Sequence, residues 1–381
     1  MPLPDIELLG RLVAFDTTSD RSNIPLADFV CEYLDLPGVR LERFPSPDGR
    51  KVNLVIEAGP QPGSERDGLT LCGHMDVVPA GEGWTSDPFS LTRVGDRLVG
   101  RGTCDMKGFL AIAANLLAEA TPGLHRPLAL LFTYDEEVGT RGARHLAETW
   151  PDAKRLPRAT IVGEPTGLRV VRAHKGIVEL RVTVTGKSAH SGYPDLGRSA
   201  IEPAVRIAAA LNELRERLAA ERPAGHEDFP EVPFVPLNLG TIRGGTASNV
   251  VPDRCELSLT FRPLPGDDGA ALTRRVSDTV RAAAADAPVE IAVTALSPAM
   301  ATPVTALVMR ELMAAAKEHD AVTGSYATDA GWLCRVGLDC AVYGPGDIAL
   351  AHRADESVPI EDLERARRVL EQVIRRLCGW G

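Results

Sequence analysis

The stretch Leu69-Thr70-Leu71-Cys72-Gly73-His74-Met75-Asp76-Val77-Val78-Pro79 decides how the rest of the chain is interpreted. It contains a short apolar run bounded by turn residues, which is typical of a buried strand. His74 and Asp76 follow two residues apart, and because strand side chains alternate, both can point to the same side of the sheet edge. Ligands bind at the carboxyl ends of strands in open α/β sheets, and a histidine oriented by a carboxylate is a common metal arrangement. Alone, a His-x-Asp pair is more often structural or part of a turn.

The composition is that of an ordinary globular enzyme. The 381 residues are enough for two domains, or for one domain with an insertion. The net charge of −10 argues against a nucleic-acid partner, which needs a basic face, but it allows a cationic substrate.

The chain carries no expected signal for export or membrane insertion. Its first residues lack a basic and apolar leader pattern, and no apolar stretch is long enough to cross a bilayer. The cysteines are odd in number and form no Cys-x-x-Cys pair, so we expect reduced thiols and a cytoplasmic location. They are Cys31, Cys72, Cys104, Cys255, Cys334, Cys340 and Cys378.

The first half of the chain alternates helices with buried strands. This alternation predicts an α/β domain with a doubly wound, mainly parallel sheet covered by helices on both faces. A hairpin turning at Gly95-Asp96 is expected within a loop region. The predicted strands are 52–58, 69–78, 128–132 and 159–162, and the helices include 5–15, 25–36, 109–120 and 142–150.

The pattern changes after residue 177. Apolar and polar residues alternate cleanly in 178–184, 255–262 and 289–293, as in an antiparallel sheet with one wet face. A long helix at 200–219 lies between them. We therefore predict an inserted α+β domain at 178–297, while 1–177 and 298–381, which ends with a strand at 340–343 and a helix at 361–377, form the other domain.

Seven acidic and imidazole groups follow predicted strands or turns. So many carboxylates at one sheet edge would repel one another and raise their own pKa values, a cost that one or two divalent cations would remove. Histidine and carboxylate ligands without paired thiolates suit zinc, cobalt or manganese. The residues are His74, Asp76, Asp105, Glu136, Glu137, Glu164 and His352.

Each of these groups also has an ordinary interpretation. Asp105 could cap a helix, and Glu136 and Glu137 could be a solvated pair at a helix start. Glu164 could be a turn residue and His352 a loop histidine. Five such coincidences at successive strand ends are much less probable than any one of them.

Cys104 lies beside one of these carboxylates. It could be a metal ligand or a nucleophile, but a small residue packed under the site is the favoured interpretation.

The motif series resembles that of the M20 metallopeptidase family. In chain order the matching segments are His74-Met75-Asp76, Gly102-Thr103-Cys104-Asp105-Met106-Lys107-Gly108, Asp135-Glu136-Glu137, Gly163-Glu164-Pro165-Thr166 and the late His352. The resemblance covers nearly the whole chain. It implies a zinc-exopeptidase type of catalytic domain with an inserted lid and dimerisation domain. Further segments at 83–89, 171–176, 237–240 and 344–347, with Asp355-Glu356, are similar to the deacetylases within the family.

The resemblance also implies roles for these residues. Glu136 would be the general base and acid, and Asp76 would be the partner that orients His74. A cis peptide is expected after Asp105. Two Zn²⁺ ions per subunit, with Co²⁺ as a possible substitute, would be held by His74 and Glu164, by Glu137 and His352, and by Asp105 between them.

Residues of the inserted domain are expected at the substrate. The resemblance implies that His190 reaches the active site of a second subunit in a homodimer and binds the oxyanion, although a histidine in such a loop is usually a surface residue. Arg262 would suit an α-carboxylate, or could be a solvated charge on its strand. Asn249, Lys175 and Thr328 complete the expected substrate-binding set, and the neighbouring Asp329 could meet a cationic side chain.

The resemblance implies a hydrolase of small N-acyl-L-amino acids. N2-acetyl-L-ornithine, cleaved to L-ornithine and acetate in arginine biosynthesis, is the expected substrate. N-acetylcitrulline, succinyl-diaminopimelate, another acyl amino acid or a dipeptide are alternatives. A non-catalytic amino-acid-binding protein on the same fold should lack the base or a ligand, yet all are present. No Gly-rich fingerprint opens the first strand-to-helix turn, which disfavours a nucleotide site.

Overall fold

The chain forms two units, each with its own sheet. The computed structural model describes residues 2–61, 63, 65–150 and 155–381. The first unit comprises Met1–Ala173, Met300–Thr323 and Thr328–Gly381, and the second comprises His174–Ala299 and Gly324–Ala327.

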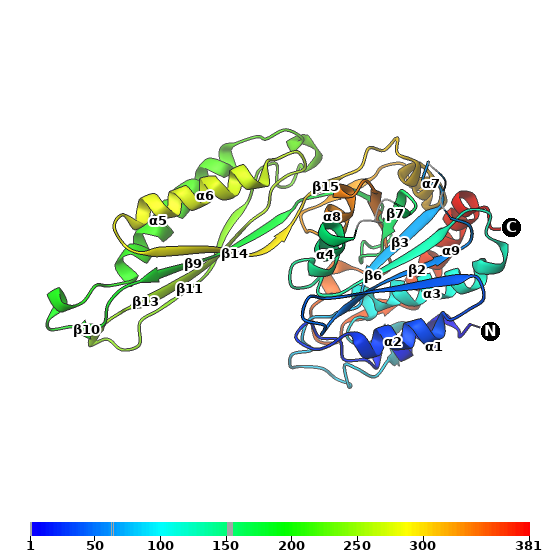
Figure 1. Cartoon of the computed structure of the whole chain (residues 1–381), viewed down its shortest axis with the longest axis horizontal. Helices are drawn as coiled ribbons and strands as arrows, with labels where there is room; N and C mark the ends of the chain where they lie inside the picture. The colour runs from blue at the N-terminus through cyan, green and yellow to red at the C-terminus, as the bar shows by residue number, and fades with distance from the viewer. Residues whose placement is uncertain (1, 62, 64, 151–154) are drawn as a thin grey trace. The chain divides into compact units, whose positions relative to one another are not determined.

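A mixed sheet forms the centre of the first unit (Figure 1). Its strand order is β1-β2-β6-β3-β7-β17-β8-β15, with β16 beside β8. The middle strands β6 (Leu128–Thr133), β3 (Leu69–His74), β7 (Ala159–Val162) and β17 (Asp339–Val342) are parallel. Antiparallel strands flank them: β1 (Val39–Pro45) and β2 (Val52–Ala58) at one side, and β8 (Val171–His174) at the other. Strands β15 (Met300–Ala301) and β16 (Val322–Gly324) both pair with β8.

Helices cover both faces of this sheet because successive strand residues point in opposite directions. Leu130 and Phe132 of β6 pack in one apolar cluster, whereas Leu131 packs in another. The first cluster includes residues of α1 (Asp5–Val13), α2 (Ile24–Tyr33), α3 (Gly108–Ala120), α7 (Leu307–Ala316) and α9 (Ile360–Cys378). The second includes residues of α4 (Arg141–Thr149) and α8 (Ala330–Arg335). The predicted α/β fold class is confirmed.

Some local predictions need adjustment. The strand predicted at 69–78 ends at His74, where the chain leaves the sheet. Strand β1 was not predicted, and its side chains are mostly half-buried at the sheet edge. The hairpin at Gly95-Asp96 is present as β4 (Thr92–Val94) and β5 (Arg97–Val99), and β18 (Ser357–Pro359) pairs with β5.

The second unit is an antiparallel sheet with two helices. In order across the sheet, the strands are β11 (Leu237–Gly244), β13 (Arg254–Phe261), β9 (Ile177–Thr185) and β14 (Val289–Ser297), and the helices are α5 (Ile201–Ala220) and α6 (Gly269–Ala284). Leu180, Leu257 and Leu259 are fully buried, as are Leu211 of α5 and Val280 of α6, while the alternate residues of β13 are half-exposed. Asp268 caps α6 by accepting from the amides of Ala270 and Ala271. Strands β10 (Ala189–His190) and β12 (Val250–Val251) form a separate two-stranded sheet.

The sequence also predicts reduced thiols and no apolar stretch long enough to cross a bilayer. All seven cysteines are free, as expected for reduced thiols. Within the described ranges, no helix combines the length and the apolar character needed to cross a bilayer.

Candidate metal centre

Three adjacent parallel strands, β6, β3 and β7, bring four of the predicted site residues to one edge of the sheet. His74 ends β3, and Glu136 and Glu137 follow β6 after two residues. Glu164 follows β7 after Gly163. At Gly163 the backbone lies so close to Phe109 of α3 that an added Cβ would be 2.1 Å from the Phe109 ring. Only glycine fits at that point, so the chain after β7 can pass the helix and present Glu164.

Two groups of potential ligands share Asp105. One contains His74, Asp105 and Glu164, and the other contains Asp105, Glu137 and His352, with the ligand atoms of each group within 4.8 Å of one another. His74 Nε2 lies 2.9 Å from Asp105 Oδ1, and His352 Nε2 lies 3.3 Å from Asp105 Oδ2. Each oxygen of Asp105 therefore faces a different histidine, as a bridging carboxylate requires.

Buried oxygens without partners fit metal ions at these positions. Among the described residues, Glu137 Oε1 and Glu164 Oε1 are buried and accept no hydrogen bond. Leaving a buried acceptor unpaired is costly, so such oxygens call for a donor or a cation. The donor set of two imidazoles and three carboxylates suits zinc or a similar divalent ion.

Protons neutralise part of this charge in the metal-free protein. Bonds to Asp105 and Glu137 raise the pKa of His352 to about 10. Burial lowers the pKa of His74, but the bond to Asp105 and the charges around it raise it well above its usual value. Burial and the charge of Asp105 raise the pKa of Glu137 to about 7 and raise that of Glu164 as well. Both histidines therefore carry protons near neutral pH.

Glu136 lies beside the two groups without joining either. Its carboxylate makes no hydrogen bond to a described residue, and burial and the charge of Glu164 raise its pKa well above the usual value. An unbonded carboxylate with a raised pKa can accept and return a proton near neutral pH. This arrangement fits the predicted general base.

Asp76 is bonded differently from the prediction. His74 Nδ1 lies 2.9 Å from the main-chain carbonyl oxygen of Asp76, whereas the carboxylate oxygen is 3.8 Å away. The carboxylate instead accepts from the amides of Glu136 and Glu137 at 3.0 and 3.2 Å. Asp76 thus orients His74 through its backbone and holds the turn that carries the Glu136-Glu137 pair.

Glu356 fixes the loop that carries Asp105. It is fully buried, and one oxygen accepts from the amides of Cys104 and Asp105 at 2.9 and 3.0 Å. The other accepts from Arg101 Nη1 at 2.6 Å and from the amide of Gly102 at 3.1 Å. Since Glu356 follows His352 by four residues, it ties the segment of one ligand to the loop of another.

The same loop settles two further expectations. The peptide between Asp105 and Met106 is cis, as the resemblance implied. The buried Cys104 thiol lies 3.5 Å from the carbonyl oxygen of Asp347 and belongs to neither ligand group, which agrees with a packed residue.

Most of the predicted substrate-binding residues belong to the second unit. His190 is exposed in β10, and its Nδ1 accepts from the amide of Gly192 at 3.0 Å. Asn249 is exposed beside β12. Arg262, which follows β13, is half-buried and makes no side-chain bond to a described residue, and burial lowers its pKa.

Lys175 differs from these residues because its ammonium group is already bonded. Its Nζ donates to the carbonyl oxygens of Val232 and Phe234 at 2.6 and 2.8 Å and lies over the Phe229 ring. Within the second unit it therefore secures the Pro-rich segment 222–236, and its substrate role stays a prediction.

Thr328 and Asp329 are buried in the first unit. The Thr328 hydroxyl accepts from the amide of Ala330 at 3.1 Å. Asp329 Oδ2 accepts from the Thr133 hydroxyl at 2.5 Å, and burial raises the pKa of Asp329 to about 6. Both side chains thus support the end of β6 and the start of α8.

The fold and the paired ligand groups define a metal-dependent amide hydrolase. The sequence profile of peptidase family M20/M25/M40 matches residues 70–376. The chain belongs to this family.

Similar proteins agree with this assignment. An acetylornithine deacetylase from Myxococcus xanthus is 39% identical over 377 residues, which cover 97% of each chain. Another from Proteus mirabilis is 35% identical over 98% of this chain and 96% of its own. A solved structure of an M20 family metallo-carboxypeptidase from Sulfolobus solfataricus has a TM-score of 0.79 and 18% identity, covering 98% of this chain and 99% of its own.

Glu356→Gln should destabilise the protein. The side-chain amide of glutamine would place its N–H groups against buried donors that now bond the Glu356 carboxylate. Breaking a buried ion pair of this kind costs about 3–5 kcal/mol of folding free energy. Chemical denaturation of the metal-free protein measures this loss. The exposed Glu361→Gln is the matched control and should change stability by less than about 0.5 kcal/mol. Equal stability of the two variants would contradict the role of Glu356.

Metal binding should release protons at pH 7. His74 and His352 are protonated in the metal-free protein and must be neutral as ligands, and Glu137 and Glu164, whose pKa values are also raised, must be ionised. Loading should therefore release at least two protons, and affinity should increase as the pH rises. Isothermal titration in buffers of different ionisation enthalpy counts these protons. His352→Ala should release about one fewer. Loading without proton release would show that the histidines are not the ligands.

Proposed function

We propose that the protein hydrolyses an N-acyl-L-amino acid, with N2-acetyl-L-ornithine as substrate and L-ornithine and acetate as products. The paired ligand groups around Asp105, with the unbonded Glu136 beside them, are the observation that carries this proposal. The similarity to acetylornithine deacetylases supports the choice of substrate. The reaction would supply ornithine for arginine biosynthesis.

The centre would hold two Zn²⁺ ions, and Co²⁺ could replace them. His74 and Glu164 would bind one ion, Glu137 and His352 the other, and Asp105 both. When bound, such ions lower the pKa of water and polarise the acyl carbonyl.

Glu136 would move the proton during hydrolysis. It accepts a proton from the attacking water and returns it to the leaving amine, because its raised pKa suits both transfers. The main-chain N–H of Glu136 donates a hydrogen bond to Asp76 Oδ1, which holds this residue in place.

Arg262 and His190 would bind the substrate. Arg262 is half-buried and has no carboxylate partner among the described residues, so its guanidinium can bind the α-carboxylate. In His190, Nδ1 accepts a bond, so Nε2 carries the proton in the neutral ring and can donate to an oxyanion. Asn249 would bind the substrate beside His190: its main-chain carbonyl oxygen accepts from the amide of Ser191, the residue after His190.

His190 would act in the active site of a second copy of the chain. A homodimer through the second unit is supported by the edge strands β11 and β14, which expose Ile242 and Val293. Free thiols support a cytoplasmic location.

The substrate is tested with a panel of acyl amino acids. The purified protein is assayed on N2-acetyl-L-ornithine, N-acetylcitrulline, N-succinyl-diaminopimelate and a dipeptide, with and without added zinc or cobalt. We expect the highest kcat/KM for N2-acetyl-L-ornithine and dependence on added metal after chelation. A higher kcat/KM for another member of the panel would replace the substrate but retain the chemistry. No turnover of any would favour a binding protein.

Glu136→Gln should abolish proton transfer while leaving the ligands in place. We expect kcat to fall by about 10²–10⁴-fold, with metal content unchanged. Steady-state kinetics and elemental analysis measure the two quantities, and the exposed Glu148→Gln serves as control. Turnover close to that of the unmodified protein would exclude Glu136 as the base.

His190→Ala should lower kcat without changing metal content or the oligomeric state. Loss of one oxyanion donor costs about 10²–10³-fold in kcat. In mixtures with Glu136→Gln, heterodimers should regain activity if His190 serves the other subunit, since one centre then has both groups. Mixtures that stay inactive would contradict the exchange.

A further inference from the structure

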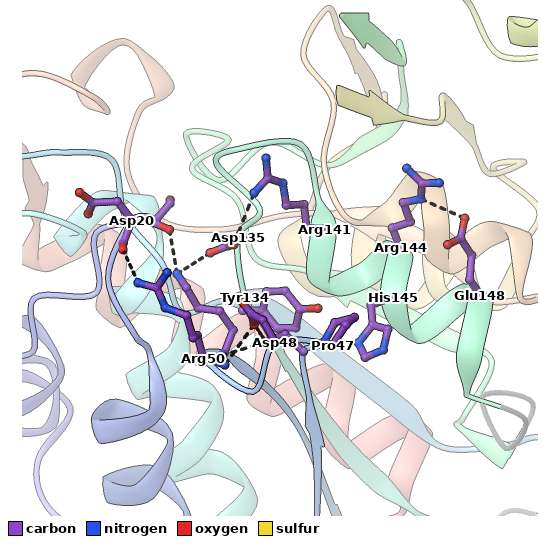
Figure 2. Close-up of a pocket in the computed structure, with 13 residues that line it drawn as sticks. Asp20, Pro47, Asp48, Arg50, Tyr134, Asp135, Arg141, Arg144, His145 and Glu148 are labelled. Carbon is purple, nitrogen blue, oxygen red and sulfur yellow. Dashed lines mark hydrogen bonds and ion pairs between the residues drawn. The ribbon is translucent and has the colours of Figure 1, made fainter. Parts of the chain in front are cut away.

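A cavity lies behind the turn that carries Glu136 and Glu137. It occupies about 610 Å³ in the first unit, and Figure 2 shows the side chains that line it. Tyr134 and Asp135 line this cavity, but neither Glu136 nor Glu137 does. One side of the turn, with Tyr134 and Asp135, therefore faces the cavity, and the other side, with Glu136 and Glu137, faces the metal centre.

A buried ion pair lies in the wall of this cavity. Lys51 Nζ is 2.6 Å from Asp135 Oδ1, and the two side chains are 8% and 9% exposed. Lys51 directly precedes β2, whose residues are all buried. Neither residue belongs to a ligand group.

Lys51 also reaches the turn by a second route. Its Nζ donates to the carbonyl oxygen of Ser19 at 2.8 Å, and the Ser19 hydroxyl donates to Asp76 Oδ2 at 2.7 Å. The Asp76 carboxylate accepts from the amides of Glu136 and Glu137. One ammonium group therefore connects both sides of the network around the catalytic turn, because it bonds both Ser19 and Asp135.

The turn needs such support because its backbone is strained. Asp135 has a φ of 52°, in the left-handed region that residues other than glycine rarely adopt. Strained residues persist only where the surroundings hold them. In the part of the chain that the structure describes, the other cation paired with Asp135 is Arg141, which lies 4.0 Å from its second oxygen and is 58% exposed.

We propose that Lys51 is a positioning residue that holds the Asp135 turn so that Glu136 and Glu137 face the metal centre. It touches neither substrate nor metal, and it acts through Asp135 and through Ser19 and Asp76. This inference rests on the proposed roles of Glu136 and Glu137.

Three variants separate positioning from simple charge balance. Lys51→Met removes the ammonium group and leaves a buried carboxylate unpaired. Lys51→Met with Asp135→Asn removes both charges, and asparagine tolerates a left-handed backbone. Arg141→Met is the matched control, because it removes an exposed cation that faces the same carboxylate and lines the same cavity.

Positioning predicts a specific set of effects for Lys51→Met. We expect kcat to fall by about 10–100-fold with KM within about twofold, because support of a ligand or base affects activity on this scale. In metal titrations, one of the two binding steps, that of the Glu137 and His352 group, should weaken about tenfold, and the other should not change. The double variant should regain thermal stability but not kcat, and Arg141→Met should match the unmodified protein.

Other results would overturn the proposal. Recovery of kcat together with stability in the double variant would show that Lys51 only balances a buried charge. Equal losses in Arg141→Met, or metal binding unchanged in Lys51→Met, would exclude a specific role. The metal titration needs no substrate, so it decides the role of Lys51 even if the protein fails to cleave every acyl amino acid tested.

Discussion

Repulsion between buried carboxylates is the constraint on which the centre depends. Asp105, Glu137 and Glu164 lie close together at one sheet edge, and each charge raises the free energy of the others. Two imidazoles between them accept protons and relieve part of this repulsion. Keeping these carboxylates together therefore costs electrostatic free energy in the folded protein. Bound cations would remove the repulsion, so that the same cluster favours metal binding.

The structure uses buried carboxylates in two opposite ways. Asp76 and Glu356 direct their oxygens at backbone amides and side-chain donors, so each is fully bonded and fixes a loop. Glu137 and Glu164 each keep one oxygen without any partner among the described residues. The bonded carboxylates hold the backbone still, and this allows the unbonded ones to stay close together instead of turning away into solvent.

The sequence predicts the parts of the centre that follow strand periodicity. His74 ends one buried strand and Glu164 lies two residues beyond another, so their convergence follows from a parallel sheet. Asp105 and His352 lie outside the strands, so the strand pattern does not place them beside the other ligands, and their roles there came from the motif resemblance. The direction of the Asp76 carboxylate could not be predicted, because it depends on a turn in a neighbouring strand connection. Lys51 was missed for the same reason: its partner is 84 residues away.

The sequence predicts the metal site more fully than the choice of substrate, and the residues concerned belong to different units. All five candidate ligands belong to the first unit, whose parallel strands fix their mutual distances. His190, Asn249 and Arg262 belong to the second unit. A metal site needs only the correct donors at the correct spacing, and a few residue types meet that need. Substrate choice depends on the shape and charge around the acyl and side-chain groups, which many residue combinations can supply, so motifs constrain it far less.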